Sequence, residues 1–407
     1  MNEFRLHKHQ QDILHSYIRS IGILNPRLNL VNDEFMVARS MISSLPVSRD
    51  LSDDNAGVML IDPILKVRHN HRKQSSASAE EAEREAFNAV VDFLQSLPRK
   101  YEVVVDLPFF PFWGEYEEVL ARDILMRSMR LEPAERVQPA AVTMADLFNQ
   151  EAKQNLIEGS VQLVFQVSGY LDESLDNHVA VEVLSKLKQL LFIFGESESI
   201  NSDRWSGNSV RLKTLDILSG NLVEIELPSL LARHVGGLRI NGEKFKYREG
   251  GPTLLGQILR SPNTDEERIA ALRDVLGPVR RYFEKIGSHG FPRIASGIVW
   301  YQDSLLNADS NLSFLAACIG LESIFGEEDS GMTELSQRLA DRYAFMLGKD
   351  RAHRDRLRKE FGGVLKLRGE LVHARTAQIR PKERNKLHAV RQMLRDSIQH
   401  ELKSLGI

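Results

Sequence analysis

The strand-like patterning of this chain stops near residue 262, and that change constrains the fold more than any other feature of the sequence. Before it, short runs rich in β-branched and aromatic residues alternate with helical segments. After Ser261-Pro262-Asn263 only helical periodicity remains. We therefore predict an α+β region over residues 1–262, followed by an all-α helical bundle over residues 263–407.

The expected strands of the α+β region are short and rich in valine, isoleucine, tyrosine and phenylalanine. An Asn241-Gly242 pair predicts a hairpin between Leu238–Ile240 and Glu243–Arg248, because a type I′ turn needs positive φ at both central residues. The polar stretch Ser75–Ser78 predicts a linker that subdivides the region. The other predicted strands are Val58–Ile61, Tyr101–Phe110, Val161–Leu171, Val210–Leu218 and Leu222–Leu227.

Start and stop signals define the expected helices. Thr264 and Glu267 form a capping-box pair that opens a helix to about Gly287, with a kink in its middle at Gly277-Pro278. Short connections between the later helices predict antiparallel neighbours in one bundle. Further helices are predicted over Ser78–Leu97, from Asp176 or Asn177 to Gly195, and over Ile294–Leu306, Asn311–Gly326, Thr333–Leu347, Arg351–His373 with a weak point at Gly362-Gly363, and Pro381–Leu405.

Charge is distributed unevenly along the chain. Residues 349–403 contain 16 lysines and arginines against 7 aspartates and glutamates, a net charge of +9, whereas the rest has 37 against 49, a net charge of −12. This asymmetry favours a polyanion or an acidic partner, although solvated cations on long helices produce the same pattern. A second basic run, Lys66–Lys73, fits either a phosphate contact or a surface loop without function.

Cysteine content and hydropathy indicate in which cellular compartment the protein functions. Cys318 is the only cysteine, so an intramolecular disulfide or a cysteine-pair metal site is excluded, and its apolar helical surroundings predict a buried, inert thiol. The most apolar run, Val179–Phe194, contains three charged residues, and the first residues lack an uninterrupted apolar segment. We expect a cytoplasmic protein with no membrane segment.

Three segments of the helical part resemble the HEPN superfamily, and within it the Apea-like group of prokaryotic defence proteins. The third segment carries an Arg-x4-His signature, from Arg368 to His373, before a polar turn and a last helix. The resemblance covers about the last 120 residues and leaves the N-terminal two thirds uncovered. The segments are Ile298–Leu305 with Phe314–Gly326, Ser336–Gly348, and Leu367–His373.

The resemblance implies a metal-independent endoribonuclease, and the two signature residue types suit that chemistry. A histidine side chain, which ordinarily titrates near pH ~6.5, can take the proton of a ribose 2′-hydroxyl or return one to the leaving 5′-oxygen. The planar guanidinium of an arginine can donate to the non-bridging oxygens of the phosphorane and stabilise their charge. Arg368 and His373 are therefore the predicted catalytic residues, and no metal or other cofactor is expected.

The resemblance also assigns roles to neighbouring charges. The family often has an acidic residue able to face the arginine where Glu322 stands, so Glu322 is a third predicted catalytic residue; the alternative is an exposed helical glutamate. Lys366 and Arg375 lie on either side of the signature and are the predicted RNA-binding cations.

The spacing of the signature favours a dimer. Five positions along a helix correspond to a rotation of about 500°, so Arg368 and His373 lie roughly 140° apart around the helix axis. Two copies that each supply this pair to a shared groove resolve the problem, and HEPN domains generally form dimers. We expect a homodimer with a composite site.

A second Arg-x4-His string, Arg395 to His400, competes with the first. Family motifs commonly place a polar residue after the arginine, which Asp396 satisfies and Gly369 does not. Position favours the first string, because it precedes the terminal helix whereas the second lies inside it. The leading hypothesis is an RNA-cleaving HEPN enzyme, acting in antiphage defence or as a toxin, whose N-terminal domain recognises a target, a phage trigger or a regulatory partner. The alternative is an inactive dimerisation or RNA-binding module with the N-terminal domain as the main binding element.

Overall fold

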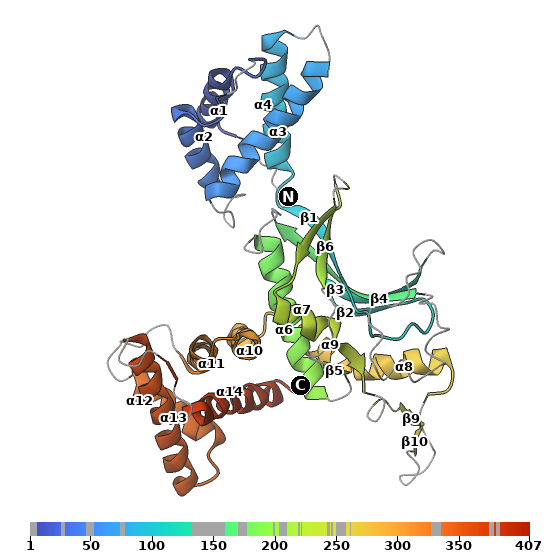
Figure 1. Ribbon diagram of the computed structural model, residues 1–407, viewed down its shortest axis with the longest axis vertical. Helices are drawn as coiled ribbons and strands as arrows, with labels where there is room; N and C mark the ends of the chain where they lie inside the picture. The colour runs from blue at the N-terminus through green and yellow to red at the C-terminus, as the bar shows by residue number, and fades with distance from the viewer. Residues whose placement is uncertain are drawn as a thin grey trace. The chain divides into compact units, whose positions relative to one another are not determined.

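A computed structural model describes most of the chain (Figure 1). It describes residues 6–25, 29–45, 53–73, 78–131, 159–169, 177–197, 200–202, 210–218, 220, 222–241, 245, 247–249, 258–260, 262–326, 335–373, 378–379 and 383–407. Within these residues no helix is both long enough and apolar enough to cross a membrane.

The chain contains an N-terminal mixed α/β region with a six-stranded antiparallel sheet, followed by a helical C-terminal region, as predicted. The last described strand, β10 (Ile258–Arg260), ends just before residue 262. Compact units follow other boundaries: the first comprises Met1–Val103, Gln166–Glu182 and Thr214–Ile225, and the second comprises Val104–Phe165, Val183–Lys213 and Glu226–Ile407. The division into domains at 1–262 and 263–407 therefore stays a prediction.

Four helices build a separate apolar core in the first unit: α1 (Lys8–Ile21), α2 (Asp33–Ser43), α3 (Asp53–Lys73) and α4 (Ala79–Gln95). Asn32 and Ser78 cap α2 and α4, because their side-chain oxygens accept from backbone N–H groups three residues on. The predicted linker beside Ser78 lies largely outside the described residues.

Two predictions about α3 are wrong. The expected strand Val58–Ile61 lies inside this helix, because Leu60 and Ile64, one turn apart, are both fully buried in the helical core. The basic run Lys66–Lys73 is helical rather than a surface loop. Arg68 and His71 are buried within it, and they bond to the carbonyl of Asn25 and to Glu85.

The six-stranded sheet has the order β2-β3-β4-β1-β6-β7. Sequence patterning identified four of its strands but missed β2 and β3. Alternation of buried and exposed positions along β2 includes Glu118, which is 7% exposed because Arg273 and Arg280 from the helices beyond residue 262 both pair with it. The strands are β1 (Arg99–Asp106), β2 (Tyr116–Ala121), β3 (Ile124–Arg130), β4 (Gly159–Gly169), β6 (Arg211–Asp216) and β7 (Leu222–Glu226).

The predicted Asn-Gly hairpin is also wrong. β8 (Leu238–Ile240) pairs with β5 (Ile200–Ser202), and β9 (Tyr247–Glu249) pairs with β10. Each expected arm therefore has its partner elsewhere in the chain, and Gly242 lies outside the described residues. The short helix α7 (Ser229–Gly236) precedes β8.

Helices α8 (Asp265–Val275) and α9 (Gly277–Glu284) confirm the predicted capping box, and at the predicted kink the structure has two separate helices. Thr264 accepts from the N–H of Glu267, whose carboxylate accepts in return from the N–H of Thr264. Gly277 opens α9, with Pro278 in its first turn.

The bundle consists of α10 (Phe291–Leu306), α11 (Ser310–Phe325), α12 (Leu335–Leu347), α13 (Arg351–Val372) and α14 (Arg384–Ser404), with α11 in contact with the other four. A Cβ on Gly320 of α11 would lie 2.5 Å from Leu394 and 3.1 Å from Trp300, so α10, α11 and α14 approach one another closely there. α13 continues through Gly362-Gly363, and the weak point predicted there is absent.

The part of α6 (His178–Ser197) from Val183 onward belongs to the second unit, like this bundle. Within that unit, Lys188 pairs with Asp303 at 2.6 Å and the Phe192 ring meets Tyr301 edge-on at 5.4 Å. The amide of Gln189 accepts from the hydroxyl of buried Tyr282 at 2.8 Å. The bundle is thereby attached to α6 by both apolar and charged contacts.

Candidate functional site

Glu322 and Arg368 form an ion pair between α11 and α13. Nη2 of Arg368 lies 3.3 Å from Oε1 and 3.4 Å from Oε2 of Glu322. Both side chains are partly open to solvent, at 37% for Arg368 and 29% for Glu322. The structure thus brings together two of the three predicted catalytic residues, and Glu322 is half-buried rather than fully exposed.

Aromatic packing holds the two helices of this pair in place. Phe325 of α11, Tyr343 of α12 and Phe361 of α13 are buried, with ring centroids 5.1–6.2 Å apart. Phe361 lies two turns before Arg368 on α13, and Leu367 beside Arg368 is 1% exposed. The backbone that carries Arg368 is therefore fixed by core contacts, while its guanidinium stays at the surface.

Cys318 lies one turn before Glu322 on α11 and is 1% exposed, as predicted for an inert thiol. Burial raises its pKa strongly, and the negative charge of Glu322 raises it further, while Arg368 opposes the shift. A thiol that stays protonated is a poor nucleophile. Cys318 therefore has a packing role beside the ion pair.

His373 occupies the C-cap of α13 and is exposed. Its backbone N–H donates to the carbonyl of Gly369 at 3.0 Å, and its imidazole lies outside the bundle core. Among the described residues no hydrogen bond or ion pair joins Arg368 to His373, in keeping with their offset around the helix.

The two predicted RNA-binding cations have different outcomes. Lys366 is exposed on α13, between Phe361 and the signature. Arg375 lies outside the described residues. Among the other charges, Asp341 of α12 pairs with Arg358 of α13.

In the competing string in α14, the arginine is paired with another helix and the histidine is exposed. Arg395 donates to Glu196 of α6 at 2.8 Å, and Gln399 donates to the same carboxylate. His400 is exposed. Arg395 thus anchors the bundle to α6.

Sequence reasoning missed an exposed aromatic residue, Phe345, that lies beneath two arginines of α13. A signal was present in the sequence. Leu339, Ala340, Tyr343 and Ala344 follow the helical period and are buried, and Phe345 falls off that face.

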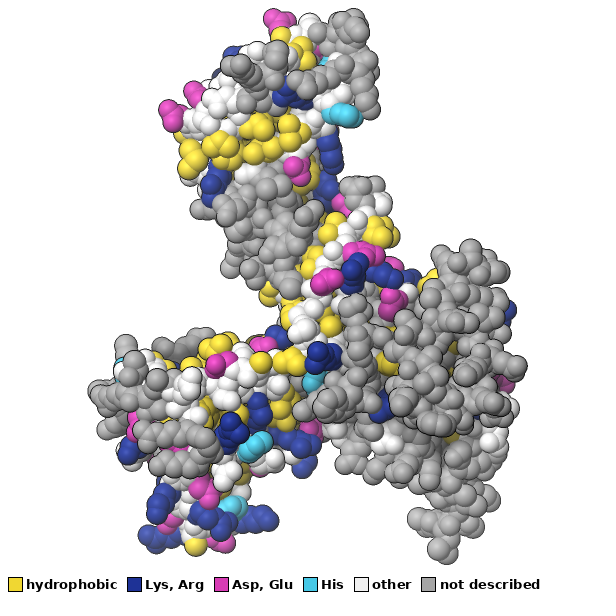
Figure 2. Space-filling model, viewed as in Figure 1, with side chains coloured by type: hydrophobic (Ala, Val, Ile, Leu, Met, Phe, Trp, Pro, Cys, Tyr) yellow, Lys and Arg dark blue, Asp and Glu magenta, His cyan; other side chains and the backbone are white. Residues whose placement is uncertain are grey.

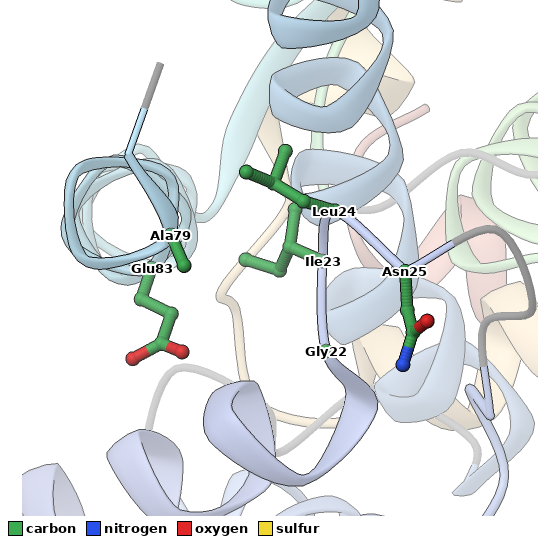
Figure 3. A pocket seen from close by; sticks show the side chains of 6 residues that line it. All are labelled: Gly22, Ile23, Leu24, Asn25, Ala79 and Glu83. Atoms are coloured by element: carbon green, nitrogen blue, oxygen red, sulfur yellow. The ribbon is translucent and has the colours of Figure 1, made fainter.

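A separate cavity of about 300 Å³ lies among the N-terminal helices (Figure 3). It is lined by the turn after α1 and by the first turns of α4, and its one carboxylate, Glu83, is 3.8 Å from Arg19. None of the predicted site residues lines it. The lining residues are Gly22, Ile23, Leu24, Asn25, Ala79 and Glu83.

Comparisons with family models, with curated proteins and with solved structures give no match to this chain.

Proposed function

We propose that this chain is a metal-independent endoribonuclease of the HEPN type, which acts as a cytoplasmic homodimer in antiphage defence or as a toxin. One observation carries the proposal: Arg368 is oriented by Glu322 at the surface of the bundle, and an exposed histidine follows five residues later on the same helix. This combination supplies a positioned cation and a proton-transfer group at the end of one rigid element.

The chemistry uses the nucleophile of the substrate itself. One His373 takes the proton of a ribose 2′-hydroxyl, the 2′-oxygen forms a bond to phosphorus, and the bond from phosphorus to the 5′-oxygen breaks. The partner subunit's His373 donates a proton to the leaving 5′-oxygen. Arg368 donates to the non-bridging oxygens as their charge grows. The products are a 2′,3′-cyclic phosphate and a free 5′-hydroxyl, with no water consumed.

A dimer is part of the proposal because one chain does not bring its own Arg368 and His373 to the same face. A two-fold axis near the end of α13 places His373 of one chain opposite Arg368 of the other. The partner copy then completes the site, and a monomer keeps the fold without the activity.

The experiment that tests the proposal is cleavage of single-stranded RNA in EDTA by the purified chain and by R368A and H373A. We expect cleavage by the parent protein, and at least about a 100-fold loss in either variant with unchanged circular dichroism. Cleavage that persists in both variants would exclude this site.

The second candidate function is an RNA-binding or dimerisation bundle without catalysis. The observation in its favour is that a carboxylate already neutralises Arg368, while Gly369 offers no polar side chain beside it. An inactive module binds RNA and dimerises, but leaves the RNA intact under every condition of the same experiment.

A further inference from the structure

Phe345 is an aromatic residue at the surface of the bundle, 60% exposed at the C-terminal end of α12. Its neighbours on α12 turn their apolar side chains inward, and the ring contributes nothing to that core. Most of the ring surface is therefore open to other groups. Its surroundings therefore indicate what it contacts.

Two arginines of α13 lie against the Phe345 ring. The guanidinium carbon of Arg354 is 4.9 Å from the ring centroid and that of Arg358 is 5.6 Å away, both within the range of a cation–π contact. Gly348 makes this approach possible, because a Cβ there would lie 2.3 Å from the side chain of Arg354. The connection between α12 and α13 is thus shaped to bring a guanidinium onto the ring.

Arg358 is held in place from two sides. Its Nε donates to Asp341 of α12, and its Nη1 donates to Asp355 one turn earlier on α13 at 2.8 Å. The arginine is therefore oriented before any partner arrives, which lowers the entropic cost of binding.

Positive charge surrounds this ring. Residues 349–366 contain seven lysines and arginines against three aspartates and glutamates. Arg351, Arg356 and Lys359 are exposed on α13, and Figure 2 shows cations gathered over the part of the bundle where Figure 1 labels α13. A partner at this surface gains by carrying negative charge.

An open path along α13 connects this cluster with the signature histidine. From Arg358 to His373 the helix rises about 22 Å. Three positions between them lie within roughly 80° of Arg358 around the helix axis. At Gly362 and Gly369 a Cβ would meet nothing within 4 Å, so among the described residues no neighbouring segment covers these two positions. The three positions are Gly362, Lys366 and Gly369.

We propose that Phe345, Arg354 and Arg358 form a base-stacking subsite for single-stranded RNA, from which the strand follows α13 to His373. The inference rests on the proposed function, and it adds where the substrate is held away from the cleaved bond. Nucleobases stack on aromatic rings and on guanidinium planes, and phosphates bind the surrounding cations. An acidic protein segment would use the cations but leave the ring uncovered, so the ring favours RNA.

The test measures binding of a short, fluorescein-labelled single-stranded RNA by fluorescence anisotropy, with the full chain carrying H373A so that the RNA stays intact. Adding F345A should weaken binding between about 5-fold and 150-fold, because one base loses its stacking partner. F345W should restore it. The matched control is L312A, which truncates an apolar side chain of similar exposure (55%) at the start of α11 and should leave binding unchanged.

The outcomes separate this inference from the ribonuclease proposal. If the unaltered chain cleaves RNA but the F345A/H373A variant binds RNA as tightly as H373A alone, the subsite is wrong and the function stands. If binding depends on Phe345 and no RNA is ever cleaved, the subsite stands and the enzyme proposal fails. Polyglutamate that displaces the RNA as well as unlabelled RNA does would identify an acidic protein partner and overturn the subsite.

Discussion

Glu322 and Arg368 face each other between α11 and α13, with both carboxylate oxygens within 3.4 Å of the same guanidinium nitrogen. Both residues are partly exposed, so the pair contributes little to folding, on the order of 0–1 kcal/mol. Its effect is on orientation, because a long side chain at the surface otherwise samples many rotamers. Glu322 therefore acts as a positioning residue for Arg368.

Variants of Glu322 should separate orientation from charge. E322A leaves Arg368 without a partner, so we expect the kcat for RNA cleavage to fall about tenfold or more. E322Q keeps an oxygen that accepts from Arg368 but removes a negative charge that repels phosphate, so KM should fall while kcat stays close to its original value. Steady-state kinetics measure both constants. Equal kinetic effects of the two variants would contradict a positioning role.

Two glycines of the bundle should respond oppositely to alanine. G320A places a Cβ against Leu394, which is fully buried and has no room to move, so we expect a loss of about 1–3 kcal/mol. G363A lies in an exposed helix interior with open space around it, so we expect a gain of about 0.5–1 kcal/mol. Urea unfolding of both variants measures the difference. A stabilising G320A would show that the three helices pack less closely than described.

The thiol of Cys318 should be unreactive in the native protein. Burial raises its pKa, so at pH 8 it is protonated and shielded from reagents. Ellman's reagent should label it slowly under native conditions and fully in guanidinium chloride. Because the chain has one cysteine, the assay reports this residue alone. Rapid native labelling would mean that α11 is exposed to solvent.

Arg395 should matter for stability rather than for cleavage. R395A removes the contact with Glu196 of α6, and a loss of roughly 0.5–1.5 kcal/mol is expected from a partly buried, charge-assisted hydrogen bond. R395A should therefore lower Tm without changing the rate of RNA cleavage. A large loss of cleavage without a change in Tm would favour the second Arg-x4-His string.

Local signals in the sequence predicted most of the helical region. Caps and breakers such as Thr264 and Gly277 act on neighbouring backbone groups, so the α8 to α14 boundaries agree with the structure to within a few residues. The pairing of Glu322 with Arg368 was also expected, but only from the family resemblance. Periodicity alone does not reveal which side chains meet across two helices.

The failures involve contacts between distant residues. Because of Glu118, the sequence of β2 has the pattern of a polar segment. The burial of Glu118 depends on two arginines about 160 residues later in the chain. The Asn241-Gly242 pair has the local chemistry of a turn, yet both arms find other strands. Val58–Ile61 has strand propensity but belongs to a helix whose packing overrides it. No single-sequence pattern contains this information.

The most direct test of the central claim is the end-group analysis of RNA cut in EDTA by the parent chain, R368A, H373A and H400A. The account predicts 2′,3′-cyclic phosphate ends from the parent and from H400A, at least about a 100-fold loss in R368A and H373A, and intact single-stranded DNA. Cleavage of DNA, arrest by EDTA, or loss of activity in H400A with H373A active would contradict it.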